Sequence, residues 1–227
     1  MQPDQISLEL DEGVAMSGLF MKPPNAKAVF VFAHGAGAGM THTFMEDVAQ
    51  GLAARSIATL RFNFPFMEAR ADKQWGRPDA APVAQKAVRS ALMKARELAP
   101  DLPLFAGGKS YGARMTSQMQ SQEAFTDLYS LIFIGFPLHL AKKPSATRAE
   151  HLSLIREPML FVQGDRDALS EITLLKSVCA SLDNATLHIV DGADHGFQVL
   201  ARSGRNNAEV TDEVCQFVDR WIEAHST

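Results

Sequence analysis

The sequence predicts an α/β protein in which a mostly parallel sheet of eight strands carries helices on both faces. Short runs of apolar, β-branched and aromatic residues alternate along the chain with stretches of helical periodicity. Most of the apolar runs are continuous, as expected for strands that are buried on both faces of a parallel sheet. Because such elements pack around one core, we expect a single domain over residues 1–227.

The strands and helices can be placed by these patterns. Two early strands are expected at Ile6–Leu10 and Val14–Met21, on either side of a turn that contains glycine. Six further strands are expected at Ala28–His34, Ile57–Phe62, Pro103–Ala106, Tyr129–Ile134, Met159–Gln163 and Thr186–Val190. Helical spacing covers Val83–Leu98 and Val210–Ile222. In an open α/β sheet, ligands bind at the carboxyl ends of the strands, so the loops that follow the strands are where chemistry is expected.

Composition and charge narrow the function classes. Lys and Arg number 22 and Asp and Glu 26, a formal net charge of −4, which does not suit a nucleic-acid binder. Cys179 and Cys215 have no metal-ligand spacing, so neither a metal site nor a disulfide framework is expected. The N-terminal segment resembles no signal peptide, and no apolar run approaches the roughly 18–20 residues that span a bilayer. We therefore expect no membrane partner and a cytoplasmic location.

The loop after the third strand is rich in glycine. It reads His34-Gly35-Ala36-Gly37-Ala38-Gly39-Met40. Such a loop turns sharply and points backbone N–H groups outward, which suits an anion or an oxyanion. A dinucleotide fingerprint would need glycine at the position of Met40, so no dinucleotide cofactor is expected. A tight loop without a function is the alternative.

The segment after the fifth expected strand holds the pattern G-x-S-x-G, with Gly108, Ser110 and Gly112. Between a strand and a helix, this pattern is typical of a nucleophile elbow. A phosphate-binding P-loop is the competing interpretation of Gly108-Lys109-Ser110, but it needs a glycine where the chain has Pro103. The pentapeptide alone is a weak signal, and its strand-to-helix position makes it specific. The alternative is that Ser110 is a buried turn residue.

A nucleophilic serine needs a base, and the base needs an acid that orients it. His195 follows the last strand, and the acid is expected between serine and histidine in chain order. The loop after Met159–Gln163 offers Asp165 and Asp167; we favour Asp167, which lies further past the strand and can reach back over its end. The predicted nucleophile, acid and base thus follow three different strands, in the chain order Ser, Asp, His.

Apolar residues are frequent in or just after the same loops: they are Met40, Phe44, Phe64, Phe66, Met67, Phe136, Leu138 and Phe197. Met40, Phe64, Phe136 and Phe197 are candidate substrate contacts, since ligand sites are mostly apolar. Ordinary core beneath the loops explains them equally well. No insertion is long enough for a large cap domain, so the longest loops, Asn63–Ala80 and Gly135–Ser153, would form any lid.

These motifs resemble the α/β-hydrolase superfamily over nearly the whole chain, most of all the small dienelactone-hydrolase-like group. Relatives of that group include a subunit of the nonspecific lethal chromatin complex. The matching segments are His34–Met40, Arg61-Phe62-Asn63-Phe64-Pro65, Gly107–Arg114, Gly135-Phe136-Pro137-Leu138-His139, Gln163–Asp167 and Asp194-His195-Gly196-Phe197.

The resemblance implies two leading antiparallel strands and six parallel ones. It also implies that Ser110 is the nucleophile, Asp167 the acid and His195 the base, and that the N–H groups of Tyr111 and of Ala36 (or Gly37) form the oxyanion hole. One departure matters, because dienelactone hydrolases carry a cysteine nucleophile where this chain has Ser110. A lactone is therefore not the default substrate.

The sequence thus predicts a serine hydrolase that acts on a small ester or thioester through an acyl-enzyme and needs no cofactor or metal. The alternative is a binding or scaffold protein that keeps the hydrolase fold, because a fold does not fix a function.

Overall fold

The computed structural model describes residues 1–71 and 77–226, and eight strands in this part of the chain form one sheet. The strands are β1 (Asp4–Asp11), β2 (Val14–Met21), β3 (Ala28–Ala33), β4 (Ile57–Phe62), β5 (Leu104–Lys109), β6 (Leu128–Ile134), β7 (Met159–Gly164) and β8 (Ala185–Val190). The helices are α1 (Thr43–Ala53), α2 (Pro65–Ala71), α3 (Ala81–Leu98), α4 (Tyr111–Gln122), α5 (Ile172–Ala180) and α6 (Asn207–Ala224), with 3-10 helices η1 (Thr147–Leu154) and η2 (Ala201–Ser203).

The order across the sheet is β1-β2-β4-β3-β5-β6-β7-β8. β1 pairs with β2 and β2 with β4 in antiparallel register, and every pairing from β4 to β8 is parallel. The predicted α/β fold with a mostly parallel, eight-stranded sheet is confirmed. β5 runs three residues further than expected, to Lys109, because Gly107 and Gly108 pair with β3 and Lys109 pairs with Ile134 of β6. Because glycine is not counted in an apolar run, the end of this strand is not recognised from the sequence pattern.

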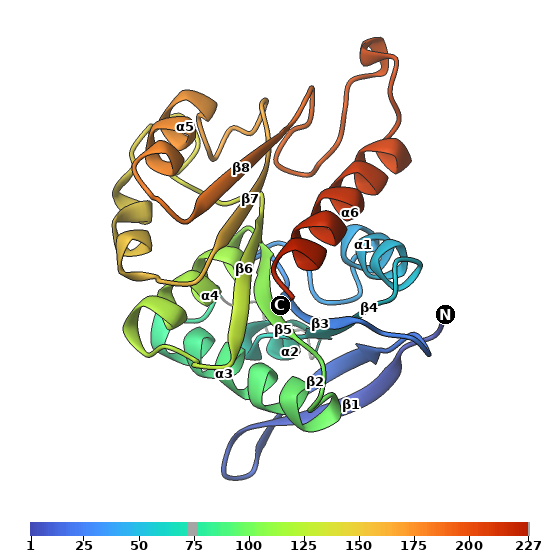
Figure 1. The fold of residues 1–227 in the computed structure, drawn as a ribbon. Helices are drawn as coiled ribbons and strands as arrows, with labels where there is room; N and C mark the ends of the chain where they lie inside the picture. Colours follow the sequence, from blue (N-terminus) through green and yellow to red (C-terminus); the bar gives the residue numbers. More distant parts are fainter. Residues whose placement is uncertain (72–76, 227) are drawn as a thin grey trace.

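The sheet is covered on both faces, as Figure 1 shows. Alternate side chains of β3 enter different clusters: Phe30 and Phe32 pack with residues of α1 and α6, whereas Val29 and Val31 pack with residues of α3 and α4. Every residue of β3 is buried, which explains the continuous apolar run in the sequence. This packing leaves the ends of the parallel strands as the place where loops can form a site.

The two long loops contain helices that the sequence patterns did not predict. α2 lies within Asn63–Ala80, of which residues 72–76 lie outside the described part, and η1 lies within Gly135–Ser153 and ends just past it. Both inserted helices are short. A proline at the first position of α2 and Glu68 in its first turn are helix-start signals that could have revealed it.

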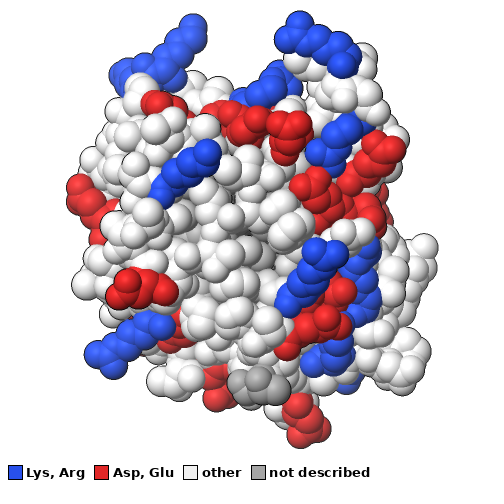
Figure 2. Space-filling view, turned by 45° about the horizontal axis from the view of Figure 1, so that its top comes forward, with Lys and Arg blue, Asp and Glu red and all other residues white. Residues whose placement is uncertain are grey.

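Charges of both signs are interspersed along the margin of the face shown in Figure 2, whose middle is mostly uncharged. Among residues 1–71 and 77–226, none of the helices combines the length and the apolar character needed to cross a bilayer.

Candidate active site

Ser110 lies between β5 and α4 in a backbone conformation that residues other than glycine rarely adopt, with φ +53° and ψ −112°. Such a conformation costs of order 1–3 kcal/mol and persists only where its surroundings enforce it. Glycine is required at the two positions that flank Ser110 in the motif, because a side chain there would not fit. A Cβ at Gly108 or at Gly112 would lie 2.5 Å from the carbonyl oxygen of Ala33. The G-x-S-x-G pattern thus corresponds to a sharp strand-to-helix turn that presents the serine.

A chain of hydrogen bonds links three strand ends. The Ser110 Oγ lies 2.8 Å from Nε2 of His195, and Nδ1 of His195 lies 2.6 Å from Oδ2 of Asp167. Because a carboxylate only accepts, Nδ1 carries the proton and Nε2 is free to accept the hydroxyl proton of Ser110. The structure therefore brings together the residues that the sequence predicted as nucleophile, base and acid.

Asp167 is buried and fully bonded. Its Oδ2 also accepts from Nε2 of Gln163 at 2.6 Å, and its Oδ1 accepts from the backbone N–H of Leu169 at 2.7 Å. These bonds hold the carboxylate that accepts from the imidazole. The less favoured candidate, Asp165, is exposed and accepts from the N–H of Gly192 at 2.8 Å. Of the two aspartates, Asp167 is the one hydrogen-bonded to His195.

The glycine-rich loop is held by side chains from β4 and α2. Arg70 donates to the carbonyl oxygen of Ala36 at 2.8 Å, and Arg61 donates to that of Met40 at 2.9 Å. His34 accepts the N–H of Phe64 at 3.0 Å, and burial lowers the pKa of His34 to about 4, so it is a neutral structural acceptor. The carbonyl oxygens of Ala36 and Met40 are thus each held by an arginine side chain.

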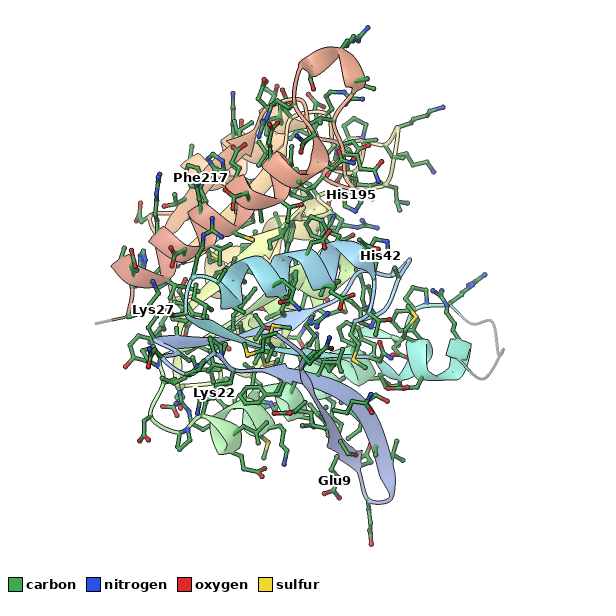
Figure 3. The ribbon with its side chains drawn as sticks, turned by 90° about the vertical axis from the view of Figure 1, so that its right-hand side faces the viewer. Glu9, Lys22, Lys27, His42, His195 and Phe217 are labelled. Carbon is green, nitrogen blue, oxygen red and sulfur yellow. The ribbon has the colours of Figure 1, made fainter. Side chains whose placement is uncertain are left out.

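A cavity of about 350 Å³ opens beside Ser110. It is lined by Gly35, Ala36, Gly37, Ala38, His42, Phe44, Met45, Lys109, Ser110, His195 and Gly196. Figure 3 shows His42 and His195 close together on one side of the molecule. Ala36 and Gly37 share the cavity with Ser110, and Tyr111 begins the helix that follows it, so both predicted oxyanion donors adjoin the serine.

The four apolar residues predicted as substrate contacts are placed elsewhere. Met40, Phe64, Phe136 and Phe197 are all buried, and none of them lines this cavity in the described part of the chain. Their side chains fold back into the core or against neighbouring rings, the alternative explanation left open by the sequence. The cavity wall comes instead from the start of α1, through His42, Phe44 and Met45. Phe44 is one of the apolar residues that the sequence places just after these loops, whereas for His42 and Met45 the preceding glycine-rich loop is the one sequence signal that could have found them.

A larger groove, of about 660 Å³, lies between the β1–β2 hairpin and α3, but it holds no residue of the hydrogen-bonded chain. Lys86 and Asp11 form an ion pair within it. In the described ranges, no group of three or more His, Cys, Asp and Glu side chains is arranged to hold a metal ion. The hydrogen-bonded chain of Ser110, His195 and Asp167 thus adjoins the smaller cavity and not this groove.

Solved structures share this fold over nearly their whole length. A dienelactone hydrolase from Anabaena variabilis is 21% identical, with 100% of each chain covered and a TM-score of 0.78. A serine hydrolase without a lid from Xanthomonas campestris is 20% identical, with 97% of this chain and 95% of that chain covered and a TM-score of 0.72. Est1E from Butyrivibrio proteoclasticus, solved with ferulic acid bound, is 15% identical, with 96% and 99% covered and a TM-score of 0.74.

The predicted kinship with the subunit of the nonspecific lethal complex stays a prediction. The superfamily itself is established by a family model, described as the alpha/beta hydrolase domain, that matches residues 26–223. The chain belongs to the alpha/beta hydrolase domain family.

Proposed function

We propose that this protein is a serine hydrolase that cleaves small carboxylic esters or thioesters through an acyl-enzyme. The observation that carries the proposal is the hydrogen-bonded chain from Ser110 through His195 to Asp167, which begins at a strained elbow. A protein that only binds a partner has no need to hold a serine in a costly conformation against an imidazole. Strain of this kind together with a base and its acid supports nucleophilic catalysis.

In the proposed reaction, Oγ of Ser110 attacks the substrate carbonyl while Nε2 of His195 takes the hydroxyl proton. Asp167 holds the imidazole in the required tautomer and stabilises the imidazolium. The negative charge on the carbonyl oxygen is stabilised by the N–H groups of Tyr111 and of Ala36 (or Gly37), each of which can contribute about 2.7–4 kcal/mol. His195 then returns the proton to the leaving alcohol or thiol, and Ser110 remains acylated.

Water completes the cycle by the same steps. His195 takes a proton from the water that attacks the acyl carbonyl, and the collapse of the second tetrahedral intermediate restores the hydroxyl of Ser110. The product is a carboxylic acid. No step needs a metal or a cofactor.

The cavity supports a small substrate. Its volume of about 350 Å³ lies at the lower end of the usual range for small-molecule sites, and its described lining contains no acidic side chain. Phe44, Met45 and the alanines of the glycine-rich loop give an apolar wall for a short acyl chain. Two structures of similar fold agree with an open site of this kind. Est1E was solved with ferulic acid bound, and the protein from Xanthomonas campestris is a serine hydrolase without a lid.

The test is a chain-length series of p-nitrophenyl esters and of acyl thioesters, with the wild-type protein and Ser110→Ala. We expect turnover that is highest for short acyl chains and absent in the variant, with a burst that equals one acyl group per chain. Folded wild-type protein that turns over no member of either series would reject the proposal and favour a scaffold that keeps the hydrolase fold.

A further inference from the structure

Lys109, which precedes the candidate nucleophile, has an unusual environment. Its side chain is 9% exposed, and its ammonium group donates to the backbone carbonyl oxygen of His195. Two aromatic rings face the ammonium: the Nζ atom lies 5.8 Å from the ring centre of Phe44 and 5.1 Å from that of Phe197. These rings stack on each other, with centroids 5.3 Å apart. The ammonium is thus enclosed by a carbonyl group and two π faces.

The loop that carries His195 needs such fixation. Two residues after it, Phe197 has φ +61°, a left-handed conformation that a bulky side chain rarely adopts. Asp194 holds one side of this loop, because its Oδ1 accepts the N–H groups of Gly196 and Gln198 at 2.8 and 3.0 Å. Among the described residues, Lys109 supplies the hydrogen bond to the carbonyl oxygen of His195 itself.

A buried cation is unfavourable for the fold. No carboxylate of the described residues forms an ion pair with Lys109, and burial lowers the pKa of Lys109 to about 8. Only the more distant charges of Asp167 and Asp194 favour its protonated form. Removing an unpaired charge from a protein interior commonly stabilises the fold, so a lysine at this position points to a role beyond stability.

A glycine leaves room for the ammonium group of Lys109. Gly135, which follows β6, adopts φ +64°, and a Cβ at this position would lie 2.9 Å from Nζ of Lys109. A residue with a side chain would therefore displace the ammonium from the carbonyl of His195. The glycine, the two rings and the carbonyl form a compartment for one extended lysine side chain.

We infer that Lys109 is a positioning residue, which ties the loop of His195 to the strand that carries Ser110 and so sets the distance between imidazole and hydroxyl. The inference rests on the proposed function and deepens it. Lys109 and Ser110 are consecutive, so the tether connects the base directly to the backbone of the nucleophile. A displacement of the base by about 1 Å can lower a rate about 10²-fold, which gives such a tether a large effect.

The experiment measures the rate of labelling by a fluorophosphonate probe and the steady-state kinetics of ester hydrolysis, together with thermal unfolding, for three variants. Lys109→Met keeps the length of the side chain and removes both donor and charge, whereas Lys109→Gln keeps a donor without the charge. Lys27→Met is the matched control, because Lys27 pairs with Asp219 and Glu223 before the start of β3, away from His195 in Figure 3.

We expect Lys109→Met to label at least 10-fold more slowly, with a Tm no lower than that of the wild type. Lys109→Gln should recover part of the rate, and Lys27→Met should label like the wild type. Equal labelling rates for Lys109→Met and the wild type would overturn the inference. So would a defect confined to the KM of acyl esters that carry a carboxylate, which would make Lys109 a substrate contact.

A second readout does not depend on activity. The proton that His195 shares with Asp167 gives a downfield NMR resonance when the pair is held, and we expect it to broaden or vanish in Lys109→Met but to persist in Lys27→Met. An unchanged resonance in Lys109→Met would contradict positioning. If the wild-type protein shows this resonance but is not labelled by the probe, the proposed function fails, and the NMR comparison alone decides the role of Lys109.

Discussion

Oδ2 of Asp167 lies 2.6 Å from Nδ1 of His195, in a pair whose carboxylate is completely buried while the imidazole reaches the cavity. The carboxylate is the fixed member, because Gln163 and Leu169 donate to it as well. The bond to the carboxylate orients the imidazole so that its Nε2 faces Ser110. This pair determines which nitrogen of the histidine can act as the base.

Replacing Asp167 by asparagine should therefore lower kcat about 10³–10⁴-fold with little change in KM. The amide offers an N–H to Nδ1, which favours the tautomer whose Nε2 is protonated and cannot accept from the serine. Steady-state kinetics on a short ester measures the effect. Asp165→Asn is the control, because that carboxylate accepts from Gly192 at the surface, and it should keep activity within a few fold. Equal losses in both variants would contradict the assignment.

The elbow should be intolerant of a methyl group. Gly108→Ala places a Cβ 2.5 Å from a backbone oxygen, so we expect a loss of about 2–4 kcal/mol in the free energy of unfolding. Urea unfolding followed by fluorescence measures it. Gly37→Ala meets nothing within 4 Å and should change stability by less than about 1 kcal/mol. Similar stabilities for the two variants would show that the strand-to-helix turn is not closely packed.

His34 should make the fold sensitive to acid. Burial lowers the pKa of His34 to about 4 from an ordinary value of 6.5. Between these values the unfolded chain holds a proton that the folded chain lacks, so stability is lost as the pH falls through this window. From pH 7 to pH 5 this group should remove up to about 2 kcal/mol. Urea titrations of the wild type and of His34→Gln at both pH values should differ by about that loss; parallel losses would contradict it.

Lys109 should have an effect of the same sign at alkaline pH. Its pKa of about 8 in the folded chain lies below the ordinary value of 10.5, so between these values the unfolded chain holds the extra proton and stability rises with pH. The wild type should gain up to about 2 kcal/mol relative to Lys109→Met from pH 8 to pH 10. Unfolding free energies at a series of pH values measure the gain, and a constant difference would mean that the ammonium is not buried.

Much of the fold follows from local patterns. Continuous apolar runs identify strands such as β3, whose residues are all buried. Two glycines flanking Ser110 at fixed spacing identify the elbow, since only glycine fits beside the carbonyl of Ala33. Chain order and position after a strand were enough to select Asp167 and His195, because parallel strands end at one edge of the sheet.

The lining of the cavity could not be predicted in the same way. An apolar residue in a loop after a strand can face the substrate or return to the core, and spacing does not distinguish these outcomes. Phe136 is fully buried against Phe133 and Phe161, whereas Phe44 reaches the cavity from α1. The role of Lys109 is likewise invisible in sequence, because its partner is a backbone carbonyl 86 residues away.

Ser117 provides a demanding control for the central claim. Its Oγ lies 2.8 Å from Nε2 of His151, so the chain holds a second serine–histidine pair. Ser117 is buried, and in the described part of the chain no carboxylate bonds to His151. Burial and the charge of Arg114 lower the pKa of His151 to about 4, which makes it a poor base. Hydrogen bonding to a histidine alone should not activate a serine.

The most direct measurement is the intact mass of the protein after reaction with a fluorophosphonate probe, for the wild type, Ser110→Ala and Ser117→Ala. One adduct on the wild type and on Ser117→Ala, with none on Ser110→Ala, is the result predicted by activation of Ser110 through His195 and Asp167. Folded wild-type protein without an adduct, or an adduct that persists in Ser110→Ala, would contradict it.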